Sequence, residues 1–123
     1  MKVIQTTNAP SAVGPYSQAI EIDSLVFASG QIALNPATGE MVEGLEAQTH
    51  QVFKNAQAVI AASGAKWENV IKTTVFITNM DDFAKINEIY ATYFKEPYPA
   101  RSCVEVSKLP KGALIEVEVI AKK

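Results

Sequence analysis

The chain has 123 residues, of which 48% are hydrophobic and 20% are charged, and its formal net charge is -2. This length predicts a single domain over residues 1–123 with one core, and the composition excludes a disordered chain. The slightly acidic balance argues against nucleic acid as a partner, because nucleic-acid-binding proteins carry a basic face. No apolar run is long enough to cross a bilayer and no leader is recognisable, so we expect a cytoplasmic protein without membrane association.

Cysteine and histidine are too scarce for several common kinds of site. The only cysteine, Cys103, excludes an internal disulfide and suits a reducing compartment. The only histidine, His50, leaves no His/Cys cluster that could hold a metal ion. No Asp-rich loop has the spacing of a calcium site either. We therefore expect no metal.

Three short strands are predicted in the first part of the chain. They cover residues 2–6, 17–22 and 25–32. Between the first two, residues 8–15 contain two prolines and a glycine, which is typical of a loop. The third strand is apolar on both faces, with Val26 and Ala28 on one face and Leu25 and Phe27 on the other.

Two helices and three more strands follow. Apolar residues recur at helical spacing after residue 44, and Gly64 provides the C-terminal stop. On that helix His50 is predicted to lie on the solvated side. The predicted elements are a helix over residues 45–63, a strand over residues 70–78, a helix between a Thr78 or Asn79 cap and Glu96-Pro97, and strands over residues 99–106 and 113–121.

This order, β-β-β-α-β-α-β-β, predicts an α+β protein with a mixed six-stranded sheet. Two helices suffice to cover only one face of such a sheet. The third and fourth strands nevertheless carry apolar side chains on both faces, as strands between two packed layers do. Another chain must then cover the second face, so we expect a homo-oligomer.

The last two strands carry the first pair of candidate functional residues, Arg101 and Glu116. If Val104 and Ile115 face the same core, Arg101 and Glu116 share the opposite face of the sheet. A guanidinium binds a carboxylate in bidentate fashion, and a carboxylate can orient a water molecule. The alternative is a surface salt bridge of Arg101 with Glu105 or Glu118.

Five further residues are weaker candidates. Asn87 interrupts the apolar stripe of the second helix, and a buried amide there would bind either a ligand or a loop backbone. Tyr16 after Gly-Pro could line a site or only pack a turn. Ser29 and Gly30 end a strand, where glycine permits the close approach of a ligand or of another backbone. Cys103 shares the predicted face of Arg101, but it has no base beside it that would activate it as a nucleophile.

Four segments, taken in order, carry a resemblance to a known family. They are Gly14-Pro15-Tyr16-Ser17-Gln18-Ala19, Ser29-Gly30-Gln31-Ile32, Lys72-Thr73-Thr74-Val75-Phe76-Ile77, and Pro99-Ala100-Arg101-Ser102-Cys103-Val104 continued by Leu109-Pro110-Lys111-Gly112-Ala113-Leu114-Ile115-Glu116. Over nearly its whole length the chain therefore resembles the reactive intermediate deaminase family, called RidA or YjgF. The resemblance implies a chorismate-mutase-like fold and a homotrimer with three sites in clefts between subunits.

The resemblance further implies an enzyme that hydrolyses 2-iminobutanoate and 2-iminopropanoate to 2-oxo acids and ammonia, without any cofactor. Pyridoxal-phosphate-dependent threonine and serine dehydratases would supply these imines. Arg101 would bind the substrate carboxylate and Glu116 would hold the attacking water. The pocket would be shaped by Tyr16, Ser29, Gly30, Asn87 and the backbone of Cys103. Two alternatives stay open: a non-enzymatic regulator that binds a 2-oxo acid or an amino acid, and an endoribonuclease that inhibits translation.

Overall fold

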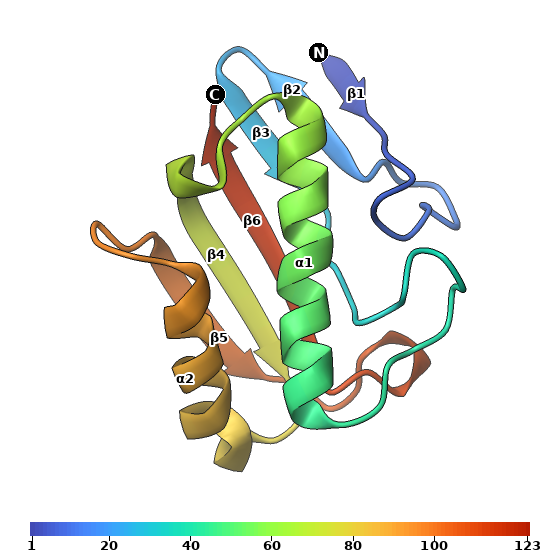
Figure 1. Cartoon of the computed structure of the whole chain (residues 1–123), viewed down its shortest axis with the longest axis vertical. Helices are drawn as coiled ribbons and strands as arrows, with labels where there is room; N and C mark the ends of the chain where they lie inside the picture. Colours follow the sequence, from blue (N-terminus) through green and yellow to red (C-terminus); the bar gives the residue numbers. More distant parts are fainter.

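The strands and helices follow each other in the predicted order, β-β-β-α-β-α-β-β (Figure 1). The computed structural model describes residues 1–123. The strands are β1 (Lys2–Ile4), β2 (Ala19–Ile22), β3 (Leu25–Ala28), β4 (Val70–Ile77), β5 (Ala100–Glu105) and β6 (Ile115–Lys122), and the helices are α1 (Leu45–Ser63) and α2 (Phe83–Tyr93). Neither helix is both long and apolar enough to span a bilayer.

The six strands form one mixed sheet in the order β1-β2-β3-β6-β4-β5. Neighbouring strands are antiparallel, except that β4 and β5 are parallel. A parallel pair needs a crossover connection, and α2 provides it between β4 and β5. The C-terminal strand β6 consequently lies inside the sheet, between β3 and β4, while β5 forms an edge.

Glycines delimit helix α1 at both ends. Gly44 and Gly64 have φ angles of 92° and 86°, in the left-handed region that side-chain-bearing residues rarely adopt. Between them Val52, Phe53 and Ile60 are fully buried against the sheet. The observed helix, Leu45–Ser63, has the predicted bounds.

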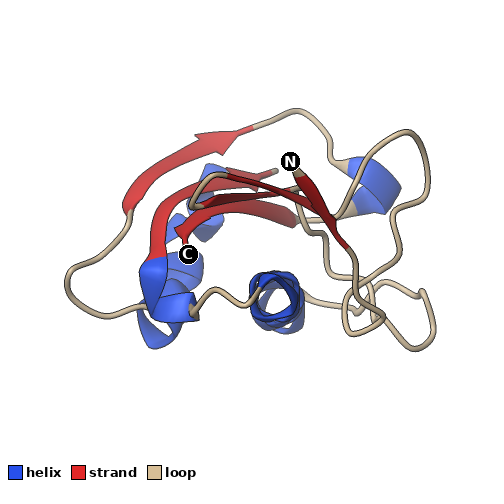
Figure 2. Cartoon of the chain, turned by 90° about the horizontal axis from the view of Figure 1, so that it is seen from above, coloured by secondary structure: helices blue, strands red, loops and turns tan.

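Both helices pack on the same face of the curved sheet (Figure 2). The strand side chains that point toward them are buried: Thr73, Val75, Ile77, Ile115, Val117 and Val119. We call the opposite side of the sheet the open face; it carries Phe27 and Phe76, together with Val104 and Glu116. Phe27 and Val104 are each 43% exposed there. The predicted mixed sheet with two helices on one face is thus confirmed.

The first three strands are shorter than the alternation predicts, since residues 5–6, 17–18 and 29–32 lie outside them. In these segments side chains form hydrogen bonds with backbone groups that would pair with a neighbouring strand in a longer sheet. The buried amide of Gln18 accepts from the N–H of Thr6 at 2.7 Å and donates to the carbonyl oxygen of Thr6 at 3.0 Å. These bonds satisfy backbone groups that would otherwise pair with a strand.

Helix α2 also begins later than predicted. A short 3-10 turn, Met80–Asp82, precedes it. The side chain of Asn79 accepts a hydrogen bond from the N–H of Asp81 at 2.9 Å, so the predicted cap residue starts the turn rather than the α-helix. The helix ends at Tyr93, before the proline that was expected to stop it.

Candidate active site

Glu116 lines a cavity of about 550 Å³ beside β6. Three other predicted site residues, Tyr16, Ser29 and Gly30, line the same cavity. They come from the loop before β2 and from the segment after β3, which β6 brings together because Gln31 forms a bridge with Val117. The apolar lining of the cavity includes Val13, Ile32 and Leu34.

The carboxylate of Glu116 packs directly against the backbone of Gly30. A Cβ atom built on Gly30 would overlap the carboxylate, so any side chain at this position requires the carboxylate to move. Burial raises the pKa of the Glu116 carboxyl, and the negative charge of Glu118 raises it further. Ser29 lies beside this pair, but its hydroxyl already donates to the carbonyl oxygen of Ser17 at 2.5 Å.

Arg101 belongs to a second group of residues, on β5 and α2. Its Nη1 atom donates to Oδ1 of Asn87 at 2.6 Å. Its guanidinium carbon lies 4.6 Å from the ring centroid of Tyr90 and 5.5 Å from that of Phe83. Cys103 follows on the same side of β5, where burial raises the pKa of its thiol and the positive charge of Arg101 partly opposes the effect.

The salt-bridge alternative for Arg101 is wrong for the isolated chain. The ion pairs of the protein join Lys85 to Glu46 and Lys123 to Glu21. Asn87, in turn, is exposed and holds the guanidinium, so it is neither buried nor bonded to a loop backbone. The guanidinium of Arg101 therefore has an amide partner and no carboxylate partner.

The predicted common face of Arg101 and Glu116 is also wrong. In the parallel register of β4 and β5, Arg101 stands beside Thr73, and Thr73 points toward the helices. Glu116 stands beside Phe76, on the open face. Neighbouring residues of paired strands share a face, so the two charged groups lie on opposite sides of one sheet. The prediction failed because it placed Val104 in the core, whereas Val104 is on the open face.

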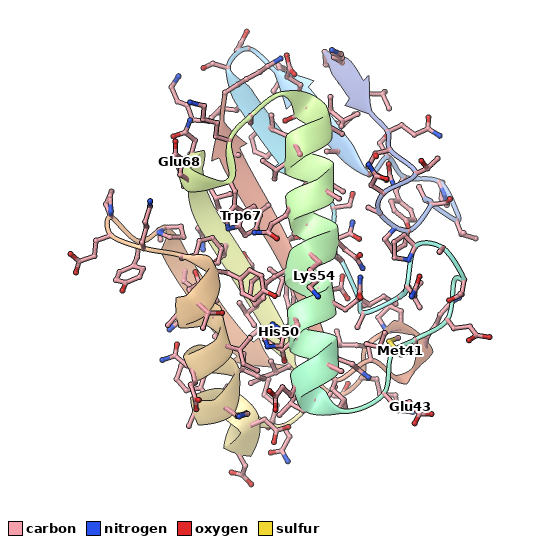
Figure 3. All side chains as sticks on the ribbon, in the orientation of Figure 1. Met41, Glu43, His50, Lys54, Trp67 and Glu68 are labelled. Atoms are coloured by element: carbon pink, nitrogen blue, oxygen red, sulfur yellow. The ribbon has the colours of Figure 1, made fainter.

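Two further differences concern residues on the helix side. His50, expected to face solvent, points from α1 toward α2 (Figure 3), and its Nδ1 lies 2.7 Å from the hydroxyl of Tyr93. Phe83 and Tyr90 were predicted only as part of the apolar stripe of α2, yet they form the aromatic surface under Arg101. A tyrosine within such a stripe was the available signal, because its hydroxyl needs a partner when buried.

No group of three or more His, Cys, Asp and Glu side chains converges in a way that could hold a metal ion. The fold that positions both groups of residues is an α+β fold with a six-stranded mixed sheet and two helices on one face.

Comparisons with known proteins assign the family. The profile of the family described as Endoribonuclease L-PSP matches residues 6–123. A crystal structure of a Rid-family protein, YyfA of Yersinia pestis, is 56% identical, covers 99% of this chain and 98% of that one, and superposes with a TM-score of 0.97. The chain therefore belongs to the Rid family, which includes RidA, YjgF and TdcF.

Two relatives in this family have informative names. A Mus musculus protein named 2-iminobutanoate/2-iminopropanoate deaminase is 46% identical over 121 residues, which are 98% of this chain and 90% of that protein. A crystal structure of Escherichia coli TdcF with bound serine is 42% identical, with a TM-score of 0.95 and coverage of 100% of this chain and 99% of that one.

Proposed function

We propose that the protein catalyses the hydrolytic deamination of 2-imino acids, among them 2-iminobutanoate and 2-iminopropanoate, to 2-oxo acids and ammonia. The observation that carries this proposal is the guanidinium of Arg101, which is held by Asn87 and Tyr90 and lacks a carboxylate partner. Such a group is suited to bind the carboxylate of a small acid. The mouse deaminase at 46% identity supports the choice of reaction.

The site needs a second copy of the chain. Arg101 and Glu116 lie on opposite sides of one sheet, so a small substrate does not reach both within one subunit. Arg101 of one subunit would face the cavity of Glu116 in its neighbour, across a cleft between copies. We therefore infer a homotrimer with three such clefts, whose formation also covers the apolar side chains of the open face.

The chemistry needs little beyond binding and one proton acceptor. In a protonated imine the carbon is electrophilic already, so a water molecule adds to it and forms a tetrahedral carbinolamine. Glu116 accepts the proton that this water loses and passes it to the nitrogen. Glu116, ionised again, takes the proton of the carbinolamine hydroxyl as the carbon–nitrogen bond breaks, so that ammonia leaves and the 2-oxo acid remains. A positioned base of this kind contributes about 10²- to 10⁴-fold to the rate.

The cavity beside Glu116 accommodates the rest of the substrate. Val13, Ile32 and Leu34 provide apolar walls, which suit the short aliphatic side chain of an imine derived from threonine or serine. Tyr16, Ser29 and Gly30 would bound the reacting carbon, and the backbone of Cys103 in the neighbouring subunit would close the pocket. Pyridoxal-phosphate-dependent dehydratases that act on threonine and serine would supply the imines in the cytoplasm.

A regulator that only binds its ligand is the second candidate, and the serine found in Escherichia coli TdcF favours it. Both candidates use the same cleft, but only the enzyme shortens the lifetime of the imine. Ribonuclease activity has less support, because the only histidine is bonded to Tyr93 between the helices rather than placed in the cleft.

A coupled assay separates these functions. Threonine dehydratase generates 2-iminobutanoate in the presence of the purified protein, and the release of 2-oxobutanoate is timed. We expect the wild-type protein to accelerate the release. Arg101→Ala should lower the acceleration at least about 100-fold, since two charge-assisted hydrogen bonds to the substrate are lost. Lys54→Ala removes an exposed cation on the outer surface of α1 and should change nothing (Figure 3).

The same assay contains the outcome that contradicts the proposal. If Arg101→Ala accelerates release as well as the wild type does, the guanidinium does not bind the substrate. If the wild type binds 2-oxobutanoate in calorimetry but leaves the decay of the imine unchanged, the protein is a ligand-binding regulator.

A further inference from the structure

The guanidinium of Arg101 contacts two aromatic rings in addition to its hydrogen-bond partner. The single side-chain hydrogen bond of Arg101 goes to Asn87, at 2.6 Å. One bond leaves the planar group free to rotate about the bond axis. The guanidinium carbon lies over the ring of Tyr90, 4.6 Å from its centroid, and over the ring of Phe83, at 5.5 Å, and packing against these rings restricts that rotation.

Tyr90 is fixed far more firmly than Arg101. Only 6% of Tyr90 is exposed, and its hydroxyl lies 2.8 Å from Oγ1 of Thr73. Its ring packs edge-on against Phe53, with centroids 5.6 Å apart and an interplanar angle of 78°. Thr73 is completely buried and stands beside Arg101 in the register of β4 and β5. Arg101 is thus linked to Thr73 in two ways: directly, through the pairing of β5 with β4, and indirectly, through the ring of Tyr90, whose hydroxyl contacts Thr73.

We propose that Tyr90 is a positioning residue that orients the guanidinium of Arg101 for a carboxylate ligand, with Thr73 as the anchor of its ring. This inference rests on the role of Arg101 in the proposed function. The donors of a guanidinium lie in its plane and none points from its faces. A ring on one face therefore restricts the side chain without using a donor, and the remaining in-plane N–H groups stay available for the two oxygens of a carboxylate.

The state of the phenol agrees with this role. Burial raises the pKa of Tyr90, although the hydrogen bond with Thr73 and the charge of Arg101 both act in the opposite direction. The hydroxyl consequently keeps its proton at neutral pH and can donate to Thr73. Tyr90 is therefore a neutral aromatic platform beside Arg101 and not an anionic partner for it.

The test uses the fact that Arg101 is the only arginine of the chain. In a nitrogen-15 NMR spectrum the protein should give one Nε–Hε signal, which reports the surroundings of this guanidinium directly. In Tyr90→Leu we expect that signal to move because the ring current is lost. The Kd for 2-oxobutanoate should rise roughly 3- to 30-fold, the range that corresponds to loss of a cation–π contact.

Two other variants isolate the cause. Tyr90→Phe keeps the ring and should retain most of the affinity for 2-oxobutanoate, so it rescues Tyr90→Leu. Tyr93→Leu is the matched control on the same helix, because Tyr93 stacks on Phe53 and contacts His50 instead of Arg101. It should lower the stability of the core but leave the arginine signal and the Kd unchanged.

An arginine signal that is identical in the wild type and in Tyr90→Leu would overturn the inference. So would an equal rise in Kd from Tyr90→Leu in the wild-type and Arg101→Ala backgrounds. If Tyr90→Leu does not fold, Thr73→Val decides by the same two readouts, since it removes only the anchoring hydroxyl. Neither readout requires turnover, so a protein that fails to hydrolyse imines can still support the positioning role of Tyr90.

Discussion

Gly30 and Glu116 share a space that has room for one side chain only. A methyl group on Gly30 would overlap the carboxylate of Glu116, so Gly30→Ala must push this carboxylate away from its place in the cavity. Displacement of a catalytic group by about 1 Å can cost about 10²-fold in rate. We expect Gly30→Ala to lose activity to that extent in the coupled assay while the protein stays folded by circular dichroism.

Gly39→Ala provides the contrasting control. Gly39 has a φ angle of 73° and no atom within 4 Å of an added Cβ, so its substitution introduces backbone strain but no clash. This variant should lose stability and keep its activity per folded molecule. The opposite pattern, with activity lost in Gly39→Ala and kept in Gly30→Ala, would contradict the role of the Gly30–Glu116 contact.

Because the pKa of Glu116 is raised, we expect Glu116→Gln to increase the stability of the protein and to decrease its activity. In the folded chain burial and Glu118 disfavour the ionised form, so above its pKa Glu116 lowers the free energy of unfolding relative to a neutral residue. Glu116→Gln should therefore be more stable than the wild type near pH 7. The difference should vanish in acid, where the carboxyl of Glu116 is protonated in both the folded and the unfolded chain. Its activity should fall about 10²- to 10⁴-fold. Urea unfolding as a function of pH, together with the coupled assay, measures both effects.

Glu118→Gln tests the electrostatic part of this prediction. If Glu116 accepts a proton from water as proposed, activity requires its ionised form and should rise with pH through the raised pKa. Removing the negative charge of Glu118 lowers that pKa, and the acidic limb of the pH–rate profile should move to lower pH. A limb that stays in place, or one that moves to higher pH, would show that another group controls the profile.

At the scale of elements, helix α1 supports one wall of the cavity through Asn55. The buried amide of Asn55 donates to the carbonyl oxygens of Ile32 at 3.1 Å and of Leu34 at 2.9 Å. Asn55→Ala leaves these acceptors without a partner and should lower the free energy of unfolding by about 1–3 kcal/mol. Gln57→Ala, on the same helix, should change it by less than about 0.5 kcal/mol. Urea unfolding compares the two, and equal losses would contradict the role of Asn55.

The elements also differ in how well the sequence predicts them. Helix α1 has a long apolar repeat and a glycine at each end, so several local signals agree and its bounds are predicted correctly. The segment predicted as the fifth strand, residues 99–106, has only two clear apolar residues, Val104 and Val106, and the prediction assigns its faces by assuming that both are buried. At the edge of the sheet that assumption fails, because Arg101 covers the aromatic surface of α2 and Val104 is left on the open face.

The candidate site also has a part that could be predicted from the sequence and a part that depends on how the strands and helices pack. Ser29, Gly30 and Glu116 line one cavity, as the family resemblance implies. The surroundings of Arg101 depend on which face of β5 meets α2, and that follows from the parallel register with β4. No local pattern encodes this register, so the partnership of Arg101 with Tyr90 was not predicted.

At the scale of the whole molecule, the open face of the sheet leaves apolar side chains exposed to solvent. Val3, Phe27 and Val104 are 58%, 43% and 43% exposed, on a sheet whose other face is fully packed. Exposed apolar side chains gathered on one face indicate a surface that is covered by another chain. The division of Arg101 and Glu116 between the two sides of the sheet points to the same arrangement. Apolar burial and the assembly of the active site would then be one event.

This arrangement predicts that two inactive variants restore each other. Arg101→Ala retains Glu116, and Glu116→Gln retains Arg101, so a cleft between one chain of each kind can contain both native residues. If equal amounts are unfolded, mixed and refolded into trimers at random, about a quarter of the clefts are complete, and about a quarter of the wild-type activity should return. Refolding each variant alone is the control, and sedimentation measures the trimer in every sample. A mixture that assembles normally but stays inactive would contradict the proposal that Arg101 and Glu116 of neighbouring copies share one cleft.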